Sequence, residues 1–142
     1  MDTNVFYISK EKAEPICAND DPARYNYDIN NYFKLQIGNS ADAIIDLISL
    51  ETLESVRTLY IPKSTEYMTR NIPEGKYFVK VIYGEGYQET TTNGVCKLSF
   101  QNERMIEKGE DELDFNTVKN HQGLNVPSYS MTLDIADEYD TD

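Results

Sequence analysis

The sequence predicts an all-β protein: an antiparallel two-layer β-sandwich of about seven strands, with room for one short helix. Three observations favour this class. Apolar side chains recur at every second position in several short runs, turn residues separate these runs, and no long helical repeats alternate with them. A parallel sheet would need crossover helices, so antiparallel pairing is expected, with two stacked sheets burying the apolar faces.

The 142 residues divide into three expected parts. Residues 1–31 form an irregular lead segment rich in Asn, Asp and Pro, in which "VFYIS" is a candidate short strand. Residues 32–136 form the sandwich domain, and residues 137–142 form an acidic tail. A chain of this length is expected to fold as one domain around a sizeable core.

The first strands of the predicted sandwich follow one another closely. In "YFKLQIG", Phe33, Leu35 and Ile37 alternate with polar residues, which predicts a half-buried strand ending at Gly38. The next run, "DAIIDLISLET", admits a helix capped by Ser40, but its β-branched residues favour a strand. "VRTLYIP" then forms a further strand, in which Arg57 shares a side with Leu59 and Ile61, and "ETLES" is the hairpin turn.

The most regular alternation follows the turn "NIPEG". Pro73 fixes one turn dihedral and Gly75 permits a tight reversal, so the chain enters a strand directly afterwards. One face of that strand carries Tyr77, Val79, Val81 and Tyr83. The other face, with Phe78 and Ile82, is also mostly apolar, which is typical of a central strand.

The second half of the chain carries weaker signals. The stretch "YGEGYQETTTNG" is expected to leave the sheet through its glycines, and the Asn93-Gly94 pair predicts a turn into the strand "VCKLSF". "NERMIEKGEDELDFN" is interpreted as a charged connection whose apolar residues pin it to the core; these are Met105, Ile106, Leu113 and Phe115. A last strand, "SYSMTLDIA", sets Tyr129, Met131, Leu133 and Ile135 on one side.

The stretch Tyr67–Val81 resembles a signature of prealbumin-like sandwiches, which include the carboxypeptidase regulatory-like domain and the Cna-B-type repeats. The match lies in an apolar residue, a proline, any residue, a glycine and then an aromatic; here these are Ile72, Pro73, Glu74, Gly75 and Tyr77. The resemblance extends from Tyr32 to about Phe100. It implies a non-enzymatic binding, adhesion or structural module that is secreted or belongs to the cell envelope.

The sequence departs from the pattern of these families in three ways, which limit the family properties that can be expected of this chain. Many Cna-B-type repeats form a cross-link from Lys to Asn or Asp between their first and last strands. In this sequence Lys34 and Asp134 fall on the polar sides of their strands, which speaks against such a bond. Residues 40–48 lack the glycine-rich turn of regulatory-like domains, and the region from Glu103 onward has no assigned counterpart.

The charge balance excludes some partners. A formal net charge of −12 argues against nucleic acid or an anionic membrane, and no apolar run approaches the roughly 18 residues of a transmembrane helix. Glu103–Asp142 carries eleven acids and three bases. The acidity supports an alternative function from another class: a small cytoplasmic regulator, such as an inhibitor or immunity-type protein, that binds a basic protein.

No catalytic motif is found, and the sequence predicts no enzyme and no cofactor. There is no GxSxG, no glycine-rich phosphate loop and no HExxH, and the single histidine, His121, lies in a polar loop. The acid-rich stretches "GEDELDFN" and "DEYDTD" offer oxygen ligands for calcium, but they do not fit the EF-hand spacing. A solvated acidic surface is therefore the favoured interpretation, with calcium as the weaker one.

The candidate interaction surface is a patch of tyrosines facing a protein or glycan partner: Tyr25, Tyr27, Tyr83 and Tyr87. Cys17 and Cys96 permit one disulfide in an oxidising compartment, although Cys96 within an apolar strand pattern favours a small buried thiol. Two locations stay open. The protein is extracytoplasmic if a signal peptide was removed ahead of Met1, and cytoplasmic otherwise. The oligomeric state is not predicted.

Overall fold

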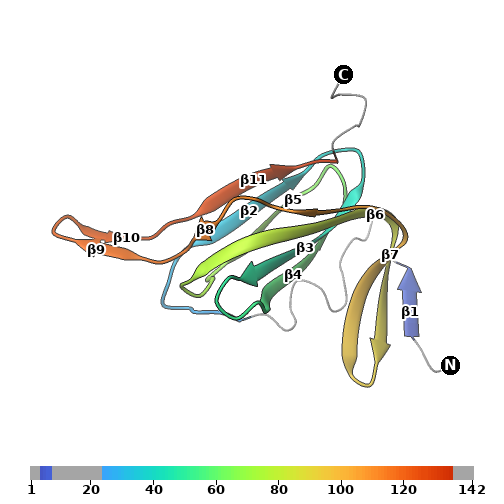
Figure 1. Cartoon of the computed structure of the whole chain (residues 1–142), viewed down its shortest axis with the longest axis horizontal. Helices are drawn as coiled ribbons and strands as arrows, with labels where there is room; N and C mark the ends of the chain where they lie inside the picture. Colours follow the sequence, from blue (N-terminus) through green and yellow to red (C-terminus); the bar gives the residue numbers. More distant parts are fainter. Residues whose placement is uncertain (1–3, 8–23, 136–142) are drawn as a thin grey trace.

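The computed structural model describes residues 4–7 and 24–135 (Figure 1). These residues form eleven strands and no helix, which confirms the all-β class. The strands are β1 (Asn4–Tyr7), β2 (Tyr32–Ile37), β3 (Asp42–Ser49), β4 (Ser55–Ile61), β5 (Glu66–Arg70), β6 (Lys76–Thr92), β7 (Val95–Lys108), β8 (Leu113–Asp114), β9 (Val118–Asn120), β10 (Gly123–Asn125) and β11 (Tyr129–Leu133).

Two sheets make up the body of the molecule (Figure 1). The larger has the order β1-β6-β3-β4, with β7 and β8 also paired to β6, and the smaller has the order β11-β2-β5. All pairs are antiparallel except β11 with β2, which is parallel. The separate β9–β10 hairpin projects from one end (Figure 1). The predicted, mostly antiparallel sandwich is therefore confirmed.

The core lies between the two sheets and follows the predicted alternation. Phe33, Leu35 and Ile37 of β2 are fully buried against residues of the larger sheet. The β6 side chains of the same core are Tyr77, Val79, Val81 and Tyr83. The two-residue period thus places the apolar side chains of both sheets in one shared core.

The central position of β3 in the larger sheet explains why the apolar residues of 42–49 fit both strand and helical spacing. It pairs with β4 on one side and β6 on the other, and its first four residues are all buried. A strand covered on both faces reads as a continuous apolar run, which resembles helical spacing in the sequence. The strand interpretation is confirmed and the helical alternative is excluded.

The turn before β6 is a bend at residues 74–75, by which the chain crosses from β5 of the smaller sheet to β6 of the larger one, so it is not the tight reversal that was predicted. The hydroxyl of Tyr77 donates to the carbonyl oxygen of Pro73 at 2.7 Å, and Gly75 adopts a φ of 150°. Ile72 is fully buried below the turn. The backbone N–H of Phe115 donates to the Gly75 carbonyl at 2.8 Å, so the turn is also tied to the end of the acidic loop.

The expectation that the chain leaves the sheet at its glycines is wrong, because β6 continues to Thr92. The pairing of β6 with β7 shifts register between Tyr83 and Gly84, and a Cβ on Gly84 would lie 2.5 Å from the carbonyl oxygen of Asn102. Gly86 has a φ of 75°. These glycines permit a bulge and a close approach of two backbones, so they bend the strand instead of ending it.

The predicted charged connection after Phe100 is also partly wrong. Residues 102–108 form the second half of β7, and Met105 and Ile106 are 36% and 54% exposed, so they do not pin the chain to the core. Leu113 and Phe115 are buried as predicted. β5, β8, β9 and β10 are strands that the sequence pattern did not predict, which explains why the predicted number of about seven was too low.

A second apolar cluster lies on the outer face of the larger sheet. Beyond the bend, the β6–β7 hairpin brings Tyr87 and Phe100 against Ile44 of β3 and Tyr60 of β4. The rings of Tyr60 and Tyr87 stack at 3.7 Å with planes 6° apart. The hydroxyl of Tyr87 donates to the buried carboxylate of Glu89 at 2.6 Å. This cluster is the reason why Tyr87 is buried.

The structure places β1 and Cys96, but Cys17 and the acidic tail are not among the described residues. β1 lies within the expected lead segment and pairs with β6, with Asn4 opposite Thr91, so this part of the segment belongs to the larger sheet. Cys96 on β7 is half-buried and disulfide-bonded, so its interpretation as a free buried thiol is wrong. Cys17, the other cysteine of the sequence, and the acidic tail at residues 137–142 lie outside the described residues.

Candidate interaction surface

The structure separates the four tyrosines of the predicted patch. Tyr83 is fully buried and Tyr87 is 2% exposed, so the expectation that they face solvent is wrong. Tyr25 and Tyr27, on the segment that precedes β2, are 37% and 76% exposed. Their rings stack with centroids 5.3 Å apart and planes 8° apart. We call these two residues the tyrosine pair.

Arg57 of β4 lies directly against the tyrosine pair. Its guanidinium carbon is 4.0 Å from the centroid of the Tyr25 ring, a cation–π contact, while the whole residue is only 1% exposed. Arg57 occupies the core-facing side of β4, together with Leu59 and Ile61. A permanent positive charge therefore lies below the exposed aromatic surface.

Neutral oxygen atoms surround the guanidinium. Its Nε donates to Thr69 Oγ1 at 2.8 Å, and its Nη2 donates to the carbonyl oxygen of Arg70 at 2.8 Å. Its Nη1 donates to the carbonyl oxygens of Val56, at 2.8 Å, and of Arg24. Burial lowers the pKa of Arg57 below its ordinary value, but a guanidinium stays protonated at neutral pH.

These contacts connect three segments that are distant in the sequence. β4 is an edge of the larger sheet and β5 is an edge of the smaller one, and Arg57 reaches from the first to the second. The segment that carries the tyrosine pair runs along this edge, where the N–H of Asn26 donates to the carbonyl of Asn71 at 2.9 Å. The segment therefore closes an edge at which the two sheets would otherwise be open.

Asn31 fixes the other end of the same segment. It is fully buried, and its side chain makes two hydrogen bonds with the backbone of Ile72: Nδ2 donates to the carbonyl at 2.8 Å, and Oδ1 accepts from the N–H at 2.7 Å. At the rim, Arg24 forms an exposed ion pair with Glu54 of the β3–β4 turn. The tyrosine pair is therefore held on a defined backbone, not on a free loop.

Sequence reasoning predicted the tyrosine pair but missed Arg57. A usable signal was present, since Arg57 falls on the apolar side of its strand next to Leu59 and Ile61. An arginine at such a position must be paired or must find acceptors within the fold. Nothing in the local sequence indicates that Tyr25 would lie over it.

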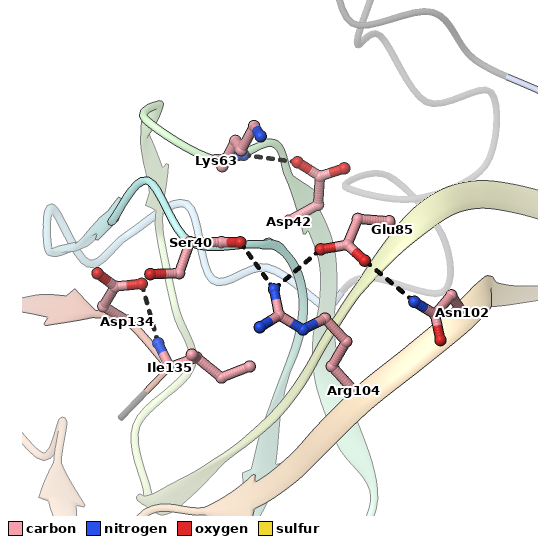
Figure 2. Close-up of polar contacts among 8 residues, drawn as sticks. All are labelled: Ser40, Asp42, Lys63, Glu85, Asn102, Arg104, Asp134 and Ile135. Atoms are coloured by element: carbon pink, nitrogen blue, oxygen red, sulfur yellow. Dashed lines mark hydrogen bonds and ion pairs between the residues drawn. The ribbon is translucent and has the colours of Figure 1, made fainter. Parts of the chain in front are cut away.

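A second group of polar residues gathers at the opposite end of the sheets (Figure 2). Arg104 Nη1 donates to the carbonyl oxygen of Ser40 at 2.9 Å and to Glu85 Oε2 at 3.0 Å, and Asn102 Nδ2 donates to Glu85 Oε1 at 3.2 Å (Figure 2). Nearby, Asp42 accepts from the backbone N–H of Lys63 at 2.8 Å. Arg104 is the extra residue where β7 shifts register, so these contacts tie the bulge to the β2–β3 turn.

The acidic loop and this polar group were the candidates for a metal site among the described residues. Within residues 4–7 and 24–135, no three His, Cys, Asp or Glu side chains are placed to hold a metal ion. Of the two predicted calcium stretches, residues 109–116 are covered by this statement and residues 137–142 lie outside the described part. The ion pair between Arg104 and Glu85 is exposed, and such pairs contribute at most about 1 kcal/mol.

Two further residues that were considered as candidates for chemistry, His121 and Lys34, lie on the surface. His121 lies at the exposed turn between β9 and β10. Lys34 Nζ lies 3.3 Å from Glu66 Oε2 across the paired strands β2 and β5, so it forms a surface ion pair on the smaller sheet. Among the described residues there is no helix of the length and apolarity that crossing a membrane requires.

Comparisons with protein-family models, with curated proteins and with solved structures gave no significant match. What is established is therefore the class that the fold defines, an all-β protein with two main sheets.

Proposed function

We propose that this chain is a non-enzymatic binding or structural module of the prealbumin-like type, secreted or part of the cell envelope, and that the tyrosine pair contacts a protein or glycan partner. The observation that carries the proposal is the exposed stack of Tyr25 and Tyr27 above the buried Arg57. A rigid sandwich edge presents this aromatic surface to the solvent.

The segment that carries the tyrosine pair is preorganised for binding. Tyrosine offers a large, flat, amphipathic surface with few rotatable bonds, so little side-chain entropy is lost when a partner covers it. Here the contact of Tyr25 with Arg57 and two hydrogen bonds, from the backbone of Asn26 to Asn71 and from the side chain of Asn31 to Ile72, already hold the segment in place. A sugar face or an extended peptide can stack on such a surface.

Two further observations support the type and the location. The signature Ile72-Pro73-x-Gly75-x-Tyr77 occupies the bend that leads into a buried central strand, as in the family that it resembles, and the role that follows is an analogy. Cys96 is disulfide-bonded, and disulfides persist mainly in oxidising compartments. Titration of free thiols without reductant, in protein taken from its native source, should therefore find none.

The alternative is a small acidic regulator in the cytoplasm that neutralises a basic protein. The net charge of −12 favours it, whereas the disulfide at Cys96 argues against that compartment. The two proposals differ in how binding depends on salt. Contact through the tyrosine pair predicts a weak salt dependence, and neutralisation of a basic partner predicts a steep one.

The test screens glycans and purified extracellular proteins for binding, and then compares Tyr27→Ala with Tyr32→Ala. Tyr32 is also an exposed tyrosine, at 36%, but it stands on β2 beside Arg70. The first variant should weaken binding by about tenfold or more, as expected for an aromatic hot spot, and the second should leave it unchanged. Equal effects of the two variants, or a steep loss of binding with added salt, would contradict the proposal.

A further inference from the structure

The β9–β10 hairpin is a projecting element without cover of its own. It pairs only with itself, through three residue pairs, and extends away from the sandwich (Figure 1). Every residue from 118 to 125 is exposed, including Val118 at 52% and Leu124 at 61%. A two-stranded hairpin is marginally stable in water unless something packs against it. We call residues 118–125 the arm.

The segments on both sides of the arm are hydrogen-bonded to the body of the molecule. Before β9, the N–H and the hydroxyl of Thr117 both donate to Glu74 Oε2, at 2.7 and 2.6 Å. After β10, the hydroxyl of Tyr129 accepts from the N–H of Asp114 and donates to its carbonyl oxygen, both at 3.0 Å. The segments that flank the arm are therefore anchored to the body.

The charge of the arm is opposite to that of the rest of the chain. Residues 115–133 are the longest stretch of the sequence without Asp or Glu, and Lys119 is their single Lys or Arg. All 25 acids of the chain lie elsewhere. An acid-free projection is complementary to an acidic surface, and a second copy of this chain presents such a surface.

A groove of about 400 Å³ lies at the same end of the molecule. Leu50 and Phe78 supply apolar lining, and the loop Gly109–Glu112 supplies the acids. Glu112 is paired with Lys76 at 3.4 Å, and Lys108 Nζ lies 4.6 Å from the Phe78 ring. Within the described part of the chain, no ion pair engages Glu110 or Asp111, so both are available to a cation from outside.

The arm and the groove match in side-chain chemistry. Lys119 and Leu124 are directly opposite one another across the hairpin, so they share one face, with a cation beside an apolar side chain. We propose that the arm of one copy docks in the groove of a second copy, with Leu124 over Leu50 and Phe78 and with Lys119 against Glu110 and Asp111. Each copy carries both the groove loop and the arm, joined through β8, so the proposed contact forms twice when the two copies are related by a two-fold axis.

The experiment measures the mass of the full chain in solution by sedimentation equilibrium over a wide concentration range. The wild type should form a dimer, and Lys119→Glu combined with Leu124→Asp should raise the dissociation constant at least about tenfold. Lys97→Glu combined with Val95→Asp is the matched control, since it changes an exposed lysine and an exposed apolar residue in the same way near the tip of the β6–β7 hairpin, and it should leave the dimer intact. Circular dichroism confirms that each variant is folded.

A charge exchange makes the test specific. Asp111→Lys should weaken the dimer alone and should restore it when combined with Lys119→Glu, because the attraction is then re-formed with reversed signs. Three results would overturn the proposal: a wild type that stays monomeric at every concentration, a dimer that is insensitive to the arm variant, or a control variant that weakens it equally. A monomer that instead binds a different acidic protein through the arm also overturns it.

Discussion

At the scale of single residues, Arg57 has the least expected environment. A buried cation normally needs a carboxylate, yet this guanidinium contacts four backbone carbonyls and a threonine hydroxyl in addition to the Tyr25 ring. The planar guanidinium fork can satisfy several carbonyls at once, which a lysine cannot do. Arg57 thereby holds together the segment with the tyrosine pair, β4 and β5.

Replacement of Arg57 tests this role. Arg57→Met retains much of the volume but leaves the carbonyls of Arg24 and Arg70 without their donor, so the free energy of unfolding should fall by about 3 kcal/mol. Urea denaturation measures the change. Arg70→Met is the control, because that side chain is exposed and its loss should matter by less than about 0.5 kcal/mol. A fall of less than about 1 kcal/mol for Arg57→Met would contradict the role.

At the scale of elements, β6 organises the larger sheet. Its first half pairs with β3 and its second half with β1, while β7 follows it on the other side. The bulge at Gly84 lets the second half turn so that Tyr87 covers Tyr60 on the outer face of the sheet. One strand therefore contributes to two apolar clusters.

The two kinds of glycine in this hairpin should respond differently to alanine. In Gly84→Ala the new Cβ meets a backbone oxygen at 2.5 Å, which cannot rotate away, so the free energy of unfolding should fall by about 3 kcal/mol. In Gly94→Ala no atom lies within 4 Å of the Cβ, and only the φ of 78° is strained, at about 1 kcal/mol. Urea denaturation of both variants shows which of them loses more free energy of unfolding. The reverse order would show that the close approach at Gly84 is not rigid.

At the scale of the whole molecule, buried tyrosines make the fold sensitive to alkali. Burial raises the pKa of Tyr60, Tyr83 and Tyr87 above the ordinary value, and neighbouring carboxylates add to the effect: Asp42, Glu107 and Glu89 respectively. Each phenol is therefore neutral in the folded chain at a pH where an unfolded tyrosine, with a pKa near 10, is already ionised.

The sign of the pH dependence follows from proton binding. Above about pH 10 the unfolded chain binds fewer protons than the folded one, so the free energy of unfolding falls by about 1.4 kcal/mol per pH unit for each of these tyrosines. Below that pH they contribute no change. Urea denaturation from pH 8 to 11, with phenolate absorbance, measures this, and Tyr60→Phe should reduce the slope by one proton. If every tyrosine ionised near pH 10 while the chain stayed folded, this prediction would be refuted.

The sequence alone determined those features that depend on neighbouring residues. Alternating apolar side chains predicted β2, β4, the first half of β6 and β11, and β-branched residues predicted β3, because side-chain period and strand propensity are local properties. The Asn93-Gly94 turn was predicted for the same reason, and both residues do adopt positive φ, 53° and 78°. The exposure of Tyr25 and Tyr27 was also predicted.

The tertiary structure decided which of these surfaces are covered. Edge strand β5 has only Thr69 buried, so its sequence shows little alternation, and it becomes a strand only because β2 pairs with it. Tyr87 is buried because Tyr60, which precedes it by many residues, lies below it, and Arg57 is satisfied by carbonyls of two other segments. Burial of a side chain depends on contacts between segments distant along the chain, and the local pattern of residues does not encode which segments will meet.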